Sequence, residues 1–246
     1  MSTETVCGRR LAVRILAVET STPAGGAALL EGDRLVGEYM VNIRATHSER
    51  LLAAVDQLLH DARWTPGDLN GLAVAVGPGS FTGLRIGIST VKGLALALGI
   101  PVAAVPTLEA LAWGLPFARE PVCPILDAKK GEVYAALFHW EADRLVRDWE
   151  DSALAPEVLC RRLAGPVIFV GDGVFAYGAL LQAELGPRAA FAPPCRRLPS
   201  PASVGQVGQA RLLAGERTEP RALTPRYLRL SEAELRRRRG PAIHPN

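Results

Sequence analysis

Residues that build metal sites and disulfide frameworks are few and scattered in this sequence. No C-x-x-C pair joins its four cysteines, and no H-E-x-x-H motif joins two of its four histidines. A structural zinc site, a disulfide-stapled fold or a metallopeptidase centre would need such clusters. We therefore expect reduced thiols, no intrinsic metal site and no cofactor. The scattered residues are Cys7, Cys123, Cys160, Cys195, His47, His60, His139 and His244.

A long hydrophobic run is missing as well. The longest stretch without a charged residue, 93–108, contains two prolines and is shorter than the ~20 apolar residues of a membrane-spanning helix. Near the N-terminus only residues 15–18 separate Arg14 from Glu19, which is too short for the core of a secretory signal. We expect a cytoplasmic protein without membrane contact. With 246 residues, 48% of them hydrophobic, the chain can bury a sizeable core in one large or two modest domains.

The order of predicted elements occurs twice along the chain. Each copy begins with three strands and continues with a later strand, a glycine-containing loop and a helix. This alternation indicates an α/β fold with duplicated subdomains, each a mixed sheet flanked by helices, which is the plan of the actin-like ATPase (ASKHA) superfamily. The first copy has expected strands at 13–19, 26–30, 34–41 and 72–76 and helices at 47–61 and 84–98; the second has strands at 122–127, 132–138, 145–149 and 167–170 and a helix at 174–184.

This repeat divides the chain into three expected segments. Residues 1–108 form an N-terminal actin-like subdomain, 109–230 form a C-terminal one whose last helix packs back across the first, and 231–246 form a flexible basic tail. Residues 217–240 hold eight arginines against three glutamates. Such a segment is either solvated or a contact for a polyanion such as nucleic acid. Arginine supplies 25 of all 28 basic residues, and this general bias favours the solvated tail.

The loop at 77–83, with the sequence GPGSFTG, precedes a predicted helix, where backbone N–H groups could bind a phosphate. Its spacing matches neither G-x-G-x-x-G, nor the P-loop, nor the G-x-S-x-G nucleophile elbow. No pairing of a nucleophile with a base is evident, so we expect no catalytic residues. The simpler interpretation, a rigid connection from strand to helix with Ser80 as a turn or capping residue, is favoured over a phosphate loop.

Carboxylates end the first strand of each copy, at Glu19 and Asp127. Oxygen ligands of this kind suit a divalent ion that accompanies a nucleotide. Turn formation would use the same residues, and the glycine–aspartate–glycine sequence in the second copy is foremost a turn signal. We assign these positions to a vestigial nucleotide site made of Glu19, Thr20, Ser21, Gly171, Asp172 and Gly173.

The predicted helix at 84–98 carries only two charged residues, Arg85 and Lys92. A helix that is apolar nearly all round must be covered nearly all round. It is therefore either the internal helix of its own domain or half of a subunit interface. Gly87 and Gly93 each cost ~1 kcal/mol of helix stability relative to alanine, and close helix approach would compensate for that cost.

Six segments together resemble the TsaB family of tRNA threonylcarbamoyladenosine biosynthesis proteins. The resemblance extends over about residues 13–230, and the glycine-rich segment is its most specific part. The segments are ILAVETST at 15–22, HSERLL at 47–52, VAVGPGSFTGLRIG at 74–87, KGLA at 92–95, DAKKGEVY at 127–134 and PRYLR at 225–229.

The resemblance implies an actin-like protein of two subdomains that has no catalytic site of its own. It implies pairing with a homologous catalytic subunit, TsaD, and with a small ATPase, TsaE. That complex transfers threonylcarbamoyl to N6 of the adenosine next to the anticodon of tRNA, and this chain would be its non-catalytic, activating subunit. The chain departs from the family at Glu19, where aspartate is usual, which weakens any nucleotide role for this position.

The resemblance also implies that the helices at 47–61 and 84–98 form the partner surface, and that the isolated chain forms a homodimer. The alternative function is a stand-alone actin-like nucleotide-binding phosphotransferase or hydrolase, which an ATP titration would distinguish. The expected partner-surface residues are His47, Leu51, Leu52, Val55, Arg85, Gly87, Val91, Gly93 and Leu94.

Overall fold

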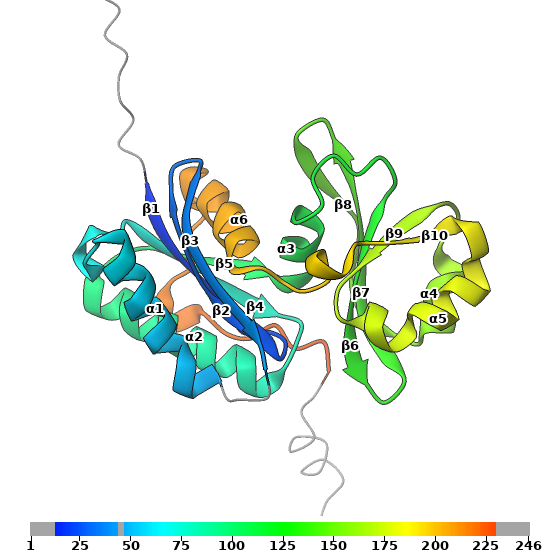
Figure 1. The fold of residues 1–246 in the computed structure, drawn as a ribbon, viewed down its shortest axis with the longest axis horizontal. Helices are drawn as coiled ribbons and strands as arrows, with labels where there is room; N and C mark the ends of the chain where they lie inside the picture. Colours follow the sequence, from blue (N-terminus) through cyan, green and yellow to red (C-terminus); the bar gives the residue numbers. More distant parts are fainter. Residues whose placement is uncertain (1–12, 44–46, 230–246) are drawn as a thin grey trace, which may run out of the picture.

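The computed structural model describes residues 13–43 and 47–229, apart from the side chains of His47 and Ser48. The expected basic tail at 231–246 lies outside the described residues, as do Cys7 and His244. Two five-stranded sheets stand side by side, and each has its own covering of helices (Figure 1).

The first sheet belongs mainly to the N-terminal half of the chain. Its strands are β1 (Arg14–Glu19), β2 (Ala24–Glu31), β3 (Arg34–Asn42), β4 (Gly71–Gly77) and β5 (Val102–Pro106), and its helices are α1 (His47–Ala62), α2 (Phe81–Leu98) and α6 (Pro201–Leu213). The strand order is β3-β2-β1-β4-β5, with β1 antiparallel to β2 and parallel to β4. The central strands are apolar on both faces because α1 and α2 pack on one face and α6 packs on the other (Figure 1).

The second sheet repeats this arrangement. Its strands are β6 (Val122–Lys129), β7 (Glu132–Glu141), β8 (Arg144–Leu154), β9 (Val167–Val170) and β10 (Ala189–Phe191), and its helices are α3 (Thr107–Trp113), α4 (Pro156–Arg162) and α5 (Gly173–Leu185). The order β8-β7-β6-β9-β10 is that of the first sheet, with β6 in the place of β1. This equivalence confirms the duplicated α/β, actin-like fold predicted from the sequence.

Helix α3 follows the last strand of the first sheet in the chain, and α6 follows the last strand of the second sheet. Both helices pack between the two sheets. Leu108 and Leu111 of α3 lie in a buried cluster with Val122 and Phe138 of the second sheet. Helix α6 follows β10 in the chain but packs on β1, β2, β4 and β5 of the first sheet. Each half therefore supplies a helix to the core of the other.

The segment after α6 returns along the first sheet before it reaches the second. Thr218 pairs with Val102 of β5, and Leu223 is buried in the core beneath α2. The backbone N–H of Arg226 donates to the carbonyl oxygen of Val76 at 2.7 Å. Near its end, Arg229 donates to the carbonyl oxygen of Ala128 in the second sheet. We call residues 216–229 the C-terminal strap.

Candidate functional site

The end of β1 is closed to solvent. Glu19 and Thr20 are 0% exposed, and Ser21 is buried beside them. One carboxylate oxygen of Glu19 accepts the backbone N–H of Ser21, and the other, Oε2, has no hydrogen-bond partner. Burial raises the pKa of Glu19 to about 7, because the charged form is poorly solvated there. A ligand could not reach this carboxyl group in the arrangement described.

The glycine-rich loop packs directly on this strand end. A Cβ atom at Gly79 would overlap the carbonyl oxygen of Ser21, and the Ser80 N–H donates to that same oxygen at 2.6 Å. The Ser80 side chain accepts the Gly83 N–H at 3.3 Å and so caps α2. The prediction that Ser80 is a capping residue is therefore confirmed.

The corresponding loop in the second half is built in the same way. A Cβ atom at Gly171 would overlap the carbonyl oxygen of Ile125, and Asp172 Oδ1 accepts the Asp127 N–H at 3.0 Å. Burial raises the pKa of Asp172 above its usual range. Between the loop at 171–173 and the strand end at 19–21, which are both fully described, no hydrogen bond or ion pair is formed. Glu19 is thus held in a closed strand end that does not fit a metal–nucleotide complex.

One side of α2 is left uncovered by the described part of the chain. Only six of its 18 residues are buried, and Leu96 is 63% exposed. The alternative of a purely internal helix is therefore wrong. By length and composition α2 also passes the criteria for a membrane span, a property it shares with core helices of globular proteins.

A groove lies between the exposed sides of α1 and α2. Its volume is about 320 Å³. Leu52, at its edge, is 58% exposed although it is a large aliphatic side chain. Exposed apolar side chains beside a groove are a feature of association surfaces. The lining residues are Leu51, Leu52, Arg85, Ile86, Ser89 and Thr90.

The structure separates the predicted partner-surface residues into two groups. Leu52, Arg85 and Gly93 are exposed, and Leu94 is half-buried. His47 lies at the start of α1, but its side chain is outside the described residues. The remaining four are a correction, because they are buried in the core of the first half, although Leu51 also reaches the groove: Leu51, Val55, Gly87 and Val91.

Gly87 shows the physical reason for this correction. A Cβ atom there would overlap Thr20 Oγ1, so the glycine permits close packing of α2 on β1 rather than on a partner. At Gly93 a Cβ atom would meet nothing within 4 Å. The prediction missed Ile86, Ser89 and Thr90 in the groove. Ser89, Gly93 and Ala97 recur every four residues on the exposed side of α2, and this spacing could have indicated that face.

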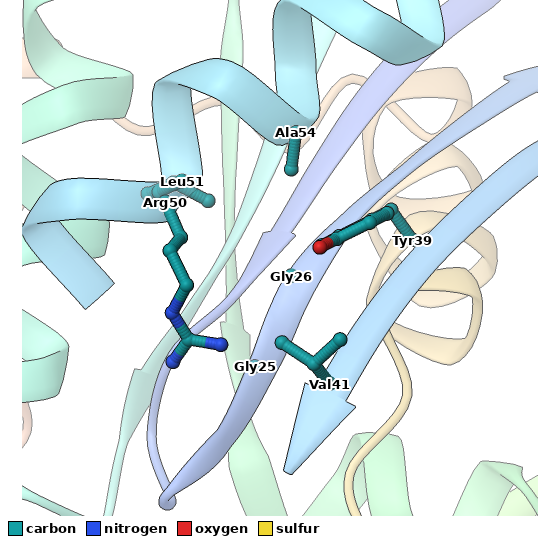
Figure 2. A pocket seen from close by; sticks show the side chains of 7 residues that line it. All are labelled: Gly25, Gly26, Tyr39, Val41, Arg50, Leu51 and Ala54. Carbon is teal, nitrogen blue, oxygen red and sulfur yellow. The ribbon is translucent and has the colours of Figure 1, made fainter. Parts of the chain in front are cut away.

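A second cavity, between α1 and β3, is too small to be a ligand site. Its volume of about 10 Å³ holds at most about one water molecule. Figure 2 shows that the side chain of Arg50 extends along it and that the hydroxyl of Tyr39 points towards its middle. Its lining residues are Gly25, Gly26, Tyr39, Val41, Arg50, Leu51 and Ala54.

Comparison with known proteins identifies the family. Residues 42–237 match the family of TsaD, the tRNA N6-adenosine threonylcarbamoyltransferase. The tRNA threonylcarbamoyladenosine biosynthesis protein TsaB of Bacillus subtilis is 34% identical over 90% of this chain and 96% of its own length. This chain belongs to the TsaB family. TsaB of Escherichia coli is 36% identical over 65% of this chain and 72% of its own length.

A solved structure agrees with this assignment to the TsaB family. YeaZ from Pseudomonas aeruginosa superimposes with a TM-score of 0.74 at 30% identity, over 88% of this chain and all of the YeaZ chain. The match to the TsaD family fits a paralogous relationship between TsaB proteins and that transferase.

Proposed function

We propose that this TsaB-family chain takes part in the biosynthesis of tRNA threonylcarbamoyladenosine as a non-catalytic, activating subunit. In this proposal it pairs with a homologous TsaD subunit, together with the ATPase TsaE, through the exposed face of α1 and α2. The same face would join two copies when the chain is isolated. The observation that carries the proposal is the groove between α1 and α2, with the exposed Leu52 at its edge, which the described part of the chain leaves uncovered.

The shape of α2 supports pairing with another helix. Ser89, Gly93 and Ala97 are small and exposed, so a partner helix could approach the α2 backbone closely. Such an approach would bury Leu52 and Leu96, whose exposure otherwise leaves apolar surface in water. A partner on this face would cover the apolar residues of α2, so their presence does not require α2 to span a membrane.

The closed strand ends support the absence of a catalytic role. A phosphotransferase or hydrolase of actin-like fold would need a carboxylate that reaches a metal–nucleotide complex, and Glu19 is fully buried. Titration of the isolated chain with ATP and Mg²⁺ tests this alternative. Saturable binding accompanied by ATP turnover would contradict the non-catalytic assignment.

The pairing surface is tested with two matched glycine substitutions. Gly93→Arg puts a charged side chain into the proposed interface, whereas Gly165→Arg puts the same side chain at a glycine of the second half that also has nothing within 4 Å. We expect both variants to fold, as judged by circular dichroism. Only Gly93→Arg should lose TsaD in a pull-down and lose tRNA threonylcarbamoylation by the reconstituted complex. Normal pairing by Gly93→Arg would refute the proposed face.

A further inference from the structure

Arg85 is held at the edge of the α1–α2 groove by two aromatic rings. Its Nε donates to the hydroxyl of Tyr227 at 3.1 Å, and its guanidinium lies 5.7 Å from the ring centroid of Phe81. The rings of Phe81 and Tyr227 are stacked, with centroids 3.9 Å apart and planes 14° apart. The three side chains therefore form one cluster beside the groove, in which the two rings stack and Arg85 binds to them from one side.

The C-terminal strap fixes the position of Tyr227. Its neighbour Arg226 is bonded through its backbone to Val76 at the end of β4. Further back, the carbonyl oxygen of Leu223 accepts a hydrogen bond from Lys92 Nζ at 3.2 Å. Because α2 itself carries Phe81, Arg85 and Lys92, the strap and the helix support each other over several turns. The Arg85 guanidinium is therefore oriented before any partner arrives.

Arg85 has no acidic partner within the described part of the chain. No ion pair joins it to any carboxylate in residues 13–43 or 47–229. Its Nε is used by Tyr227, which leaves the terminal nitrogens for another acceptor. A partner that covered the groove with apolar side chains alone would remove water from this charge and leave it uncompensated, which is strongly unfavourable. A carboxylate on the partner would compensate this charge at the edge of the groove.

We propose that Arg85 is the charged anchor of the partner surface and receives an aspartate or glutamate from a helix of the TsaD subunit, with Tyr227 as the residue that positions it. This proposal rests on the proposed function, because it assumes that the α1–α2 face is where pairing occurs. It makes the C-terminal strap part of the recognition site, although the strap is far from α2 in the sequence.

The test measures the affinity of the full-length chain for the TsaD subunit of the same organism at several salt concentrations. Arg85→Gln should weaken binding about tenfold or more and reduce its salt dependence. Tyr227→Phe keeps the ring stack but removes the hydroxyl, and it should weaken binding about three- to tenfold. The double variant should bind no more weakly than Arg85→Gln, because the hydroxyl acts only through Arg85. Arg161→Gln and Tyr177→Phe, both in the second half, are matched controls that should leave binding unchanged.

The outcomes separate this proposal from the proposed function. If Arg85→Gln and Tyr227→Phe bind normally while Gly93→Arg does not, the face is right and the charged anchor is wrong. Additive losses in the double variant would likewise overturn the positioning role of Tyr227. If Gly93→Arg also binds normally, the proposed face fails. Should Tyr227→Phe perturb the fold, Arg85→Lys keeps the charge but loses the Nε–H, and normal binding by that variant would overturn the role of the Tyr227 contact.

Discussion

Arg226 and Asp151 form an ion pair that joins the two halves of the protein, with Nη1 of the arginine 3.2 Å from Oδ2 of the aspartate. Asp151 lies on β8 with its side chain fully buried, and its other oxygen accepts Arg147 Nη1 at 2.5 Å. The backbone of Arg226 is bonded to Val76 at the end of β4. Arg226 of the C-terminal strap therefore connects the two sheets, with its side chain on the second and its backbone on the first.

Loss of this ion pair should destabilise the whole chain. Arg226→Gln leaves the buried Asp151 with one cation instead of two, and since Arg226 is 41% exposed we expect a loss of about 1–2 kcal/mol in the free energy of unfolding. Glu150→Gln is the control, because Glu150 also lies near Arg226 but is 77% exposed, and its effect should stay within about 0.5 kcal/mol. Urea denaturation measures both, and equal effects would contradict the role given to Asp151.

Glu19→Gln should stabilise the protein at high pH and not at low pH. The unfolded carboxyl group loses its proton near its ordinary pKa of 4.5, whereas the folded one keeps it up to about 7. The stability of the parent protein therefore falls as the pH rises through this window, by up to about 3 kcal/mol, and stays lower above it. Glutamine is neutral throughout, so its advantage should appear at pH 8 and vanish at pH 4.

The measurement is the unfolding free energy of Glu19→Gln relative to the parent protein between pH 4 and pH 8. Glu216→Gln, at an exposed position after α6, serves as the control for general pH effects. A pH-independent difference between Glu19→Gln and the parent would show that folding does not raise the pKa of Glu19.

Alanine at the two glycines of α2 should have effects of opposite sign. Gly87→Ala places a methyl group against Thr20 Oγ1 and should cost about 1–3 kcal/mol of stability. Gly93→Ala meets no atom within 4 Å, so the higher helix propensity of alanine should add up to about 1 kcal/mol. Thermal unfolding at low protein concentration, where association is weak, compares them. A destabilising Gly93→Ala would place that position inside the core.

Substitution of the arginines of the C-terminal tail should leave folding intact, and it tests whether the tail contacts tRNA or solvent. Replacement of Arg236, Arg237, Arg238 and Arg239 by serine should leave the unfolding free energy unchanged, because four adjacent arginines are not buried together. If the tail contacts tRNA, the assembled complex should bind tRNA more weakly, with a salt-dependence slope lower by about one for each lost phosphate contact. An unchanged slope would assign the tail to solvent.

The sequence predicted the strongly patterned elements and missed those that depend on tertiary packing. Strand β4 and helices α1 and α2 lie within a few residues of their predicted bounds, because their apolar residues follow a clear period. A last helix packing back across the first half was expected, but no residue range was predicted for α6, since Gly205 and Gly208 are unfavourable for an isolated helix. Both glycines are explained by close packing of α6 against side chains of the first sheet, which no local pattern reveals. The short elements β5, β10, α3 and α4 were also not predicted.

The sequence predicted which two helices carry the proposed partner surface. It did not predict which side of each helix is exposed. In an amphipathic helix the polar side identifies the solvent face, but α2 is apolar nearly all round. The sequence therefore could not tell that Val91 packs inward while Gly93 faces outward. The role of Tyr227 was equally hidden, because its contact with Arg85 joins residues 142 positions apart.

The exchange of helices between the two halves has a consequence for synthesis on the ribosome. The strands of the first sheet leave the ribosome early, but one of their faces, with Ala17 and Ala73, is not fully covered until Val204 and Val207 of α6 have been made. The core of the first half is thus finished only after the second half has been translated. A nascent or prematurely ended chain would present this incompletely covered face to chaperones and proteases, and separate expression of the two halves would yield two fragments that each lack a helix of their own core.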